Sequence, residues 1–161
     1  MDLAYLRYEL ERAGWRDLGP GQHMGFPFEL IGRRRYTLTR WDVLVKVLPR
    51  LDQAIANVWR NNFQEINRRS KSWIWGRCFI LCLVAEEVSP EVLHALKGDS
   101  FGLFGMFRLQ GGGGNVFVAD EQNGLVYGNI PALPLDVHRF SQSTVDVLSR
   151  ALAAGRQQTR G

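Results

Sequence analysis

The sequence predicts one α/β domain with a mixed sheet flanked by helices. Three observations support this class. The 161 residues suit a single domain with a substantial core. Segments of helical period alternate with short apolar runs that are typical of strands. A long amphipathic segment separates two of these runs and predicts a crossover helix that returns the chain to the same sheet. With no repeat or linker, we expect one domain over 1–155 and a frayed tail over 156–161.

The first half of the chain predicts a helix, a hairpin and a second, longer helix. Leu3, Leu6 and Leu10 share one helical stripe, and Gly14 ends that helix. A loop containing GPG follows. Phe26, Phe28 and Leu30 alternate toward one face, and the second strand is expected to end at Pro49. The predicted elements are a helix over 3–13, a strand over 26–33, a turn over 34–40, a strand over 41–48 and a helix over 50–69.

The second half predicts a central strand, a short helix, a hairpin and a last helix. The apolar run from 78 to 84 suits a strand covered on both faces. Ser89 is the expected N-cap of the short helix, with Pro90 at its first position. Gly98–Gly114 is expected to be a connector with one strand near 106–109. Within it, Gly111 to Gly114 could form a phosphate-binding loop, but no GK[ST] follows. The remaining elements are strands over 116–119 and 125–127, joined by a turn at Asn-Gly, and a helix over 144–154.

The cysteines and the hydrophobicity of the chain indicate its cellular compartment and whether it enters a membrane. Cys78 and Cys82, four residues apart on a strand, are separated by roughly 13 Å, too far for a disulfide. We therefore expect buried free thiols and a reducing compartment. No apolar run is long enough to cross a bilayer, and the N-terminus lacks the layout of a signal peptide. These features predict a cytoplasmic protein that does not enter a membrane.

The positive charge lies in the first half of the chain. Residues 1–77 hold 14 Lys and Arg against 8 Asp and Glu, a net of +6, whereas residues 78–161 hold 6 against 8, a net of −2. Such a footprint is typical of a protein that binds nucleic acid or another polyanion, although it also fits an arginine-rich surface without a partner. The candidate nucleic-acid-binding residues are Arg33, Arg34, Arg35, Arg40, Arg68, Arg69, Lys71, Trp73 and Trp75. Trp59 belongs to a helical apolar stripe and is expected in the core.

The predicted elements include, in order, a helix ending in ERAGW, a hairpin whose second strand carries hydrophobic-x-Lys at Lys46, a helix and an apolar strand. The order of these elements resembles the PD-(D/E)xK nuclease-like fold. The branch that looks most similar is that of Mrr-type restriction enzymes and their small prokaryotic relatives. The resemblance covers roughly residues 3–90, and GLVYGNIPALPLDVHRF is loosely similar to the closing strand and loop. It implies a restriction-endonuclease-like fold and catalytic positions at Glu29 and Lys46, with Asp42 as the candidate second acid and Mg²⁺ as cofactor if the site is active.

In that family an acid on the first strand and an acid-x-lysine on the second converge on one divalent metal. Glu29 matches the first acid and Lys46 the lysine, but position 44, where the second acid belongs, is Leu. Asp42, on the same face as Lys46, is one substitute; Asp52 and Glu65 on the next helix are others. Lys46 can instead pair with Glu29 across the hairpin, extend from an edge, or remain as a phosphate contact.

Three functions follow from these observations. The first hypothesis is a nuclease-fold protein that binds nucleic acid, or acts as an accessory subunit, without efficient catalysis and without a bound metal. The second is an active nuclease that depends on a divalent metal. The third is a non-enzymatic interaction subunit whose basic residues meet a protein partner.

Overall fold

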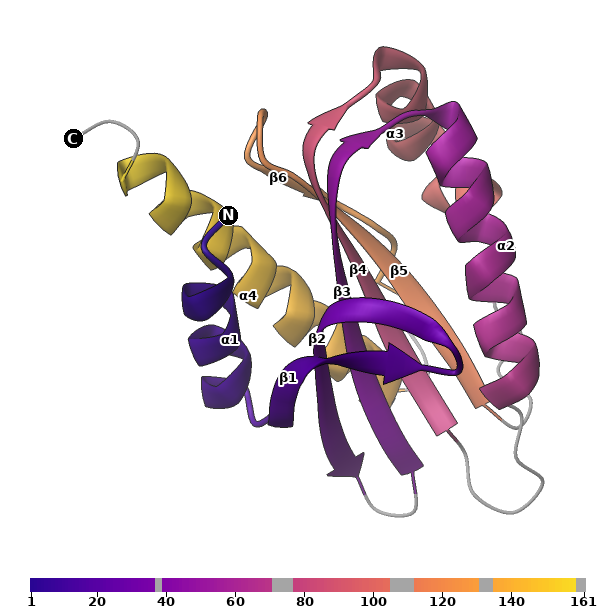
Figure 1. Ribbon diagram of the computed structural model, residues 1–161, viewed down its shortest axis with the longest axis vertical. Helices are drawn as coiled ribbons and strands as arrows, with labels where there is room; N and C mark the ends of the chain where they lie inside the picture. Colours follow the sequence, from indigo (N-terminus) through magenta and orange to yellow (C-terminus); the bar gives the residue numbers. More distant parts are fainter. Residues whose placement is uncertain (37–38, 71–76, 105–111, 131–134, 159–161) are drawn as a thin grey trace.

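The computed structural model describes residues 1–36, 39–70, 77–130 except 105–111, and 135–158. Within these ranges, six strands form one mixed sheet with helices on both faces (Figure 1). The single α/β domain predicted from the sequence is therefore confirmed. The elements, in chain order, are α1 (Leu3–Arg12), β1 (Arg16–His23), β2 (Phe26–Tyr36), β3 (Thr39–Leu51), α2 (Gln53–Ser70), β4 (Arg77–Val88), α3 (Pro90–Phe104), β5 (Gly112–Asp120), β6 (Leu125–Tyr127) and α4 (Leu135–Gln158).

The strands lie side by side in the order in which they occur in the chain, from β1 to β6. The first three form an antiparallel meander, β4 and β5 are parallel to β3, and β6 returns antiparallel. The helices α2 and α3 are the crossovers that the two parallel pairings require. As expected, the hairpin lies beside the strand at 78–84, which forms the centre of β4.

Two hydrophobic clusters cover the two faces of the sheet. Helices α1 and α4 pack on one face, where Leu10, Trp41 and Leu148 are buried together. Helices α2 and α3 cover the other face, around Phe63 and Phe79. The apolar side chains of β3 contribute to both clusters, with Val43 and Val45 in the first and Leu44 in the second, because neighbouring side chains of a strand point to opposite faces. Cys78 and Cys82 are free thiols buried in the first cluster, and burial raises the pKa of the Cys82 thiol.

The first half of the chain differs from the prediction at three places. The expected loop before residue 26 contains β1, an edge strand with little apolar character. The expected turn over 34–40 is mostly strand, because β2 runs to Tyr36 and β3 begins at Thr39. Pro49 does not end β3, which continues to Leu51. The pairing of β2 with β3 ends at Leu30 and Val45, so beyond it β3 has a hydrogen-bonded neighbour on one side only, and a proline is tolerated there.

The second half has longer elements than expected. Ser89 caps α3 as predicted, but the helix continues to Phe104, so the first part of the expected glycine connector is helical. The strand expected near 106–109 lies outside the described residues. Gly112 to Gly114 open β5 and do not form a loop. Helix α4 spans Leu135–Gln158, and Arg156 donates to the carbonyl of Gln122, so residues 156–158 are not a frayed tail.

The expected alternation along β2 breaks at Glu29. Phe28 lies in the cluster under α2, whereas Leu30 lies in the cluster under α1 and α4. Beside this point the register between β1 and β2 shifts, because Gly19 pairs with Ile31 and Gly21 pairs with Phe28. One extra residue in β2 therefore forms a bulge. The bulge turns the tip of the β1–β2 hairpin across the sheet toward α2 (Figure 1).

No helix among the described residues is both long enough and apolar enough to cross a membrane.

Candidate functional site

Arginines lie in register on four adjacent strands, where β2 ends and β3 and β4 begin. Arg16 on β1 pairs with Arg33 on β2. One step further along the strands, Arg35 on β2 pairs with Arg40 on β3, which pairs with Arg77 on β4. Paired residues of neighbouring strands point to the same face, roughly 5 Å apart. Five guanidinium groups, from Arg16, Arg33, Arg35, Arg40 and Arg77, therefore share one face at one end of the sheet.

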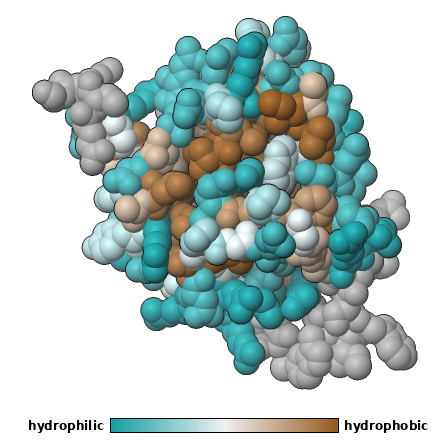
Figure 2. Space-filling model, in the orientation of Figure 1, coloured by the Kyte–Doolittle hydropathy of each residue, from teal (hydrophilic) through white to brown (hydrophobic). Residues whose placement is uncertain are grey.

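Four of these arginines surround a pocket of about 480 Å³, which we call the arginine pocket. Among the described residues that line it, Asp17 is the only acid. No hydrogen bond or ion pair is found for Arg16, Arg33 or Arg35 within the described part of the chain, and all three are exposed. The end of the molecule where β2 ends is correspondingly hydrophilic in Figure 2. The lining residues are Gly14, Arg16, Asp17, Arg33, Arg34, Arg35 and Arg40.

Asp42 is the buried acid beside these arginines, with 2% of its surface exposed. It pairs with Arg33 in the β2–β3 register, and its Oδ1 accepts a hydrogen bond from Arg40 Nε at 3.1 Å. His23, at the tip of the β1–β2 hairpin, places Nδ1 3.9 Å from the other carboxylate oxygen. Burial lowers the pKa of His23, although the charge of Asp42 opposes this. Asp42 thus offsets one of the five positive charges and anchors Arg40.

Arg34 has a structural role. It points to the opposite face from Arg33 and Arg35, where its Nη1 donates to the carbonyl of Ala13 at 2.6 Å. Its guanidinium carbon lies 4.7 Å from the centre of the Phe140 ring, a cation–π contact. Arg34 therefore joins the end of α1 to α4, and it contributes less free charge to a ligand than its two neighbours do.

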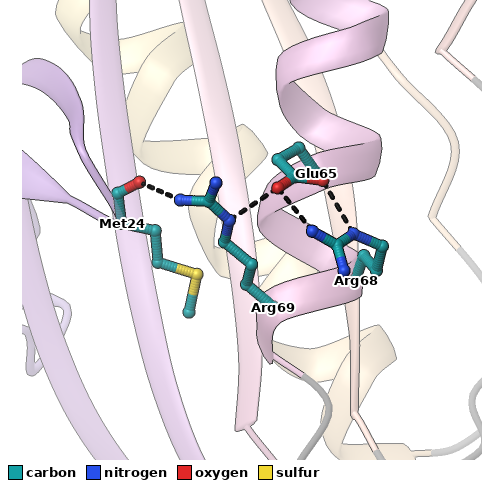
Figure 3. A network of polar contacts seen from close by, with 4 residues as sticks. All are labelled: Met24, Glu65, Arg68 and Arg69. Atoms are coloured by element: carbon teal, nitrogen blue, oxygen red, sulfur yellow. Dashed lines mark hydrogen bonds and ion pairs between the residues drawn. The ribbon is translucent and has the colours of Figure 1, made fainter.

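The second predicted basic group, at the end of α2, is partly neutralised (Figure 3). Both Arg68 and Arg69 donate to the carboxylate of Glu65, at 2.7 and 2.6 Å, and hydrogen bonds from the two arginines lower the pKa of Glu65 to about 2. Arg69 also donates to the carbonyl of Met24, so it ties α2 to the tip of the β1–β2 hairpin. The predicted contacts Lys71, Trp73 and Trp75 lie outside the described residues. Trp59 is buried, as expected.

The structure brings together two of the three predicted catalytic residues. Lys46 Nζ lies 2.8 Å from Glu29 Oε1, and the other oxygen of Glu29 accepts the backbone N–H of Val47 at 2.8 Å. Asp42 has different partners, Arg40 and His23. Leu44, fully buried, lies between Asp42 and Lys46 on the same face of β3.

The substitute carboxylates have other partners as well. Asp52 accepts the backbone N–H of Ile55 near the start of α2, and Glu65 binds its two arginines. Among the described residues, no group of three His, Cys, Asp or Glu side chains is placed to hold a metal ion. The contacts of Glu29 match the cross-hairpin pairing that was one of the alternatives for Lys46.

Sequence reasoning missed Arg16 and Arg77 as members of the basic group. Arg16 lies on the edge strand β1, which no apolar pattern in the sequence predicts. Arg77 precedes the apolar run that marks β4, so the sequence pattern places it outside the strand. The available signal was register: once β3 and β4 are taken as parallel neighbours, Arg40 and Arg77 become partners.

No family model, no curated protein and no solved structure matches this chain.

Proposed function

We propose that this protein binds nucleic acid through the arginine pocket, mainly by phosphate contacts and without strong sequence readout. The observation that carries the proposal is the set of like charges in register across β1 to β4. Like charges directly opposite one another destabilise a sheet, and a polyanion relieves this repulsion. Phosphates are also the groups that arginine forks recognise best.

The proposed binding does not include efficient cleavage. A nuclease of the kind that the sequence resembles needs two acids and a lysine around one metal. Here Glu29 is engaged by Lys46 and Val47, and Leu44 offers no oxygen where the second acid belongs. We expect no robust cleavage of duplex DNA with Mg²⁺ or Mn²⁺. Cleavage by the purified protein that is lost in both Glu29→Gln and Lys46→Met variants would establish the nuclease alternative.

The binding test compares two double variants with equal loss of charge. Arg33→Ala/Arg35→Ala removes two pocket arginines, and Arg7→Ala/Arg50→Ala removes two arginines that are in surface ion pairs elsewhere. Arg34 is left in place because it holds α1 and α4 together. Affinity for a fluorescent oligonucleotide is measured at several salt concentrations.

The expected result is weaker binding to all sequences by the pocket variant. Each lost phosphate contact should flatten the slope of log affinity against log salt by about 0.9 for duplex DNA or about 0.7 for a single strand. The control variant should keep the wild-type slope. An unchanged slope in the pocket variant, with its circular dichroism intact, would reject the proposal and favour an interaction subunit that binds an acidic protein.

A further inference from the structure

A second hollow adjoins the arginine pocket and has a different chemical character. It has a volume of about 880 Å³ and lies between α1 and α4, and we call it the helix groove. Its lining mixes the cations Arg12, Arg139 and Arg150 with hydrogen-bonding groups such as Gln142 and Asp146. Glu9, almost fully buried, accepts from both Arg12 and Arg150, and a hydrogen bond from Arg150 is the main cause that lowers the pKa of Glu9.

The two hollows meet along two pairs of consecutive residues. Ala13 lines the helix groove and Gly14 lines the arginine pocket. At the end of β2, Arg35 lines the arginine pocket and Tyr36 lines the helix groove. The hydrogen bond from Arg34 to the Ala13 carbonyl lies at this boundary. Because Arg34 and Tyr36 face the opposite side of β2 from Arg33 and Arg35, a ligand that occupies both hollows passes around the end of β2.

Tyr36 is an exposed aromatic side chain at this boundary. It retains 39% of its surface and makes an edge contact with the ring of Phe140, 5.6 Å between centres. Proteins that bind single strands combine a basic groove for the backbone with aromatic side chains on which bases stack. Bases of a duplex are already stacked and paired, so only an unpaired strand can place them in such a groove.

Building on the proposed function, we infer that the nucleic acid is single-stranded and runs from the arginine pocket across Tyr36 into the helix groove. Phosphates occupy the arginine pocket, where arginines outnumber the one acid. Bases lie along Tyr36 and in the helix groove, where Gln142 Nε2 donates to Asp146 Oδ1 at 2.9 Å and the amide keeps its oxygen and its second N–H for base edges. Arg139, which has no ion pair among the described residues, contacts a further phosphate.

The first experiment compares ligands. Fluorescence anisotropy measures the affinity for a labelled oligothymidylate of 12 nucleotides, a blunt duplex of 12 base pairs and a poly-glutamate peptide of equal charge. The inference expects the single strand to bind about tenfold or more tightly than the other two, as loss of a stacked base alone costs of this order. Equal affinity for the duplex or for the peptide would overturn it.

The second experiment compares variants. Tyr36→Leu should weaken binding of the oligothymidylate about tenfold, whereas Tyr36→Phe keeps the ring and should bind as the wild type does. Arg139→Ala should flatten the salt slope by about 0.7, and Arg50→Ala, at the far end of β3, should not. If Tyr36→Leu fails to fold, the Arg139→Ala and Arg50→Ala pair decides alone. If only the Arg33 and Arg35 variant loses binding, this inference falls and the proposed function stands; if that variant binds normally, both fall.

Discussion

Lys46 and Glu29 form an ion pair across the β2–β3 hairpin, 2.8 Å between Nζ and Oε1, at the point where β2 leaves β3. The same carboxylate accepts the N–H of Val47, which has lost its partner strand on that side. Glu29 therefore takes the place of a neighbouring strand, and Lys46 balances its charge. This pairing accounts for the presence of an ammonium group within an apolar strand.

The first prediction separates the two functions of Glu29. Glu29→Ala removes the acceptor of a backbone N–H and leaves Lys46 unpaired, so the free energy of unfolding should fall by about 1–3 kcal/mol. Lys46→Met keeps the contact with Val47 and should cost about 0–1 kcal/mol, as expected of a partly exposed ion pair. Urea unfolding measures both. Equal losses in the two variants would show that the backbone contact is unimportant.

The second prediction concerns the stability cost of the arginine pocket. Arg33→Ala/Arg35→Ala relieves repulsion between neighbouring strands, so at low salt the free energy of unfolding should rise by about 0.2–1 kcal/mol. At 1 M salt, where charges are screened beyond about 3 Å, the gain should vanish. Urea unfolding at both salt concentrations checks this. Arg7→Ala/Arg50→Ala is the control and should give no gain; a pocket variant destabilised at low salt would contradict the argument.

The third prediction uses the pH dependence of the Glu65 network. The folded carboxyl group has a pKa of about 2 against an ordinary value of 4.5, so the folded state binds fewer protons than the unfolded state. Its stabilising effect is complete above about pH 4.5 and is lost as the pH falls toward 2. Glu65→Gln should therefore flatten the pH dependence of unfolding within this window, as followed by urea unfolding at several pH values. Identical profiles for the variant and the wild type would contradict it.

The fourth prediction tests why β5 opens with glycines. A Cβ atom at Gly114 would lie 2.5 Å from the ring of Phe79, so Gly114→Ala should destabilise the fold by about 1–3 kcal/mol. Gly19 has no heavy atom within 4 Å of the same position, and Gly19→Ala is the matched control. Adding Phe79→Leu should make Gly114→Ala less costly, because the smaller side chain leaves room. A double-mutant cycle of thermal or urea unfolding measures this coupling.

The fold was predictable wherever the apolar pattern was strong. The apolar run at 78–84 predicted β4, and the helical spacing of apolar residues over 50–69 predicted α2. Together they predicted a crossover helix and therefore the parallel pairing of β3 with β4. β1 was missed because Arg16–His23 holds two glycines and a proline and buries only Leu18, so it carries no strand period. The prediction that Pro49 ends β3 was wrong because a strand tolerates proline where it has no neighbour on one side. Where β2 separates from β3 depends on the tertiary structure and cannot be read from the local sequence.

The candidate site was only partly predictable for a related reason. The charge run at Arg33 to Arg35 was visible, but strand alternation sends Arg34 to the opposite face, where Ala13 and Phe140 engage it. The partners Arg16 and Arg77 come from strands whose bounds the sequence left open. Likewise, the contact between Arg69 and Met24 depends on the hairpin tip crossing toward α2, which the bulge at Glu29 produces.

The packing of α1 against α4 has a consequence for how the protein is made. Leu6 and Leu10 of α1 are buried with Val147 and Leu148 of α4, and Glu9 binds Arg150, 141 residues later. On the ribosome, the strands can pair in the order in which they emerge, but the part of this face that α4 covers stays open until α4 is released. We therefore expect a chain that stops before α4 to expose apolar surface and to aggregate more readily than the full chain.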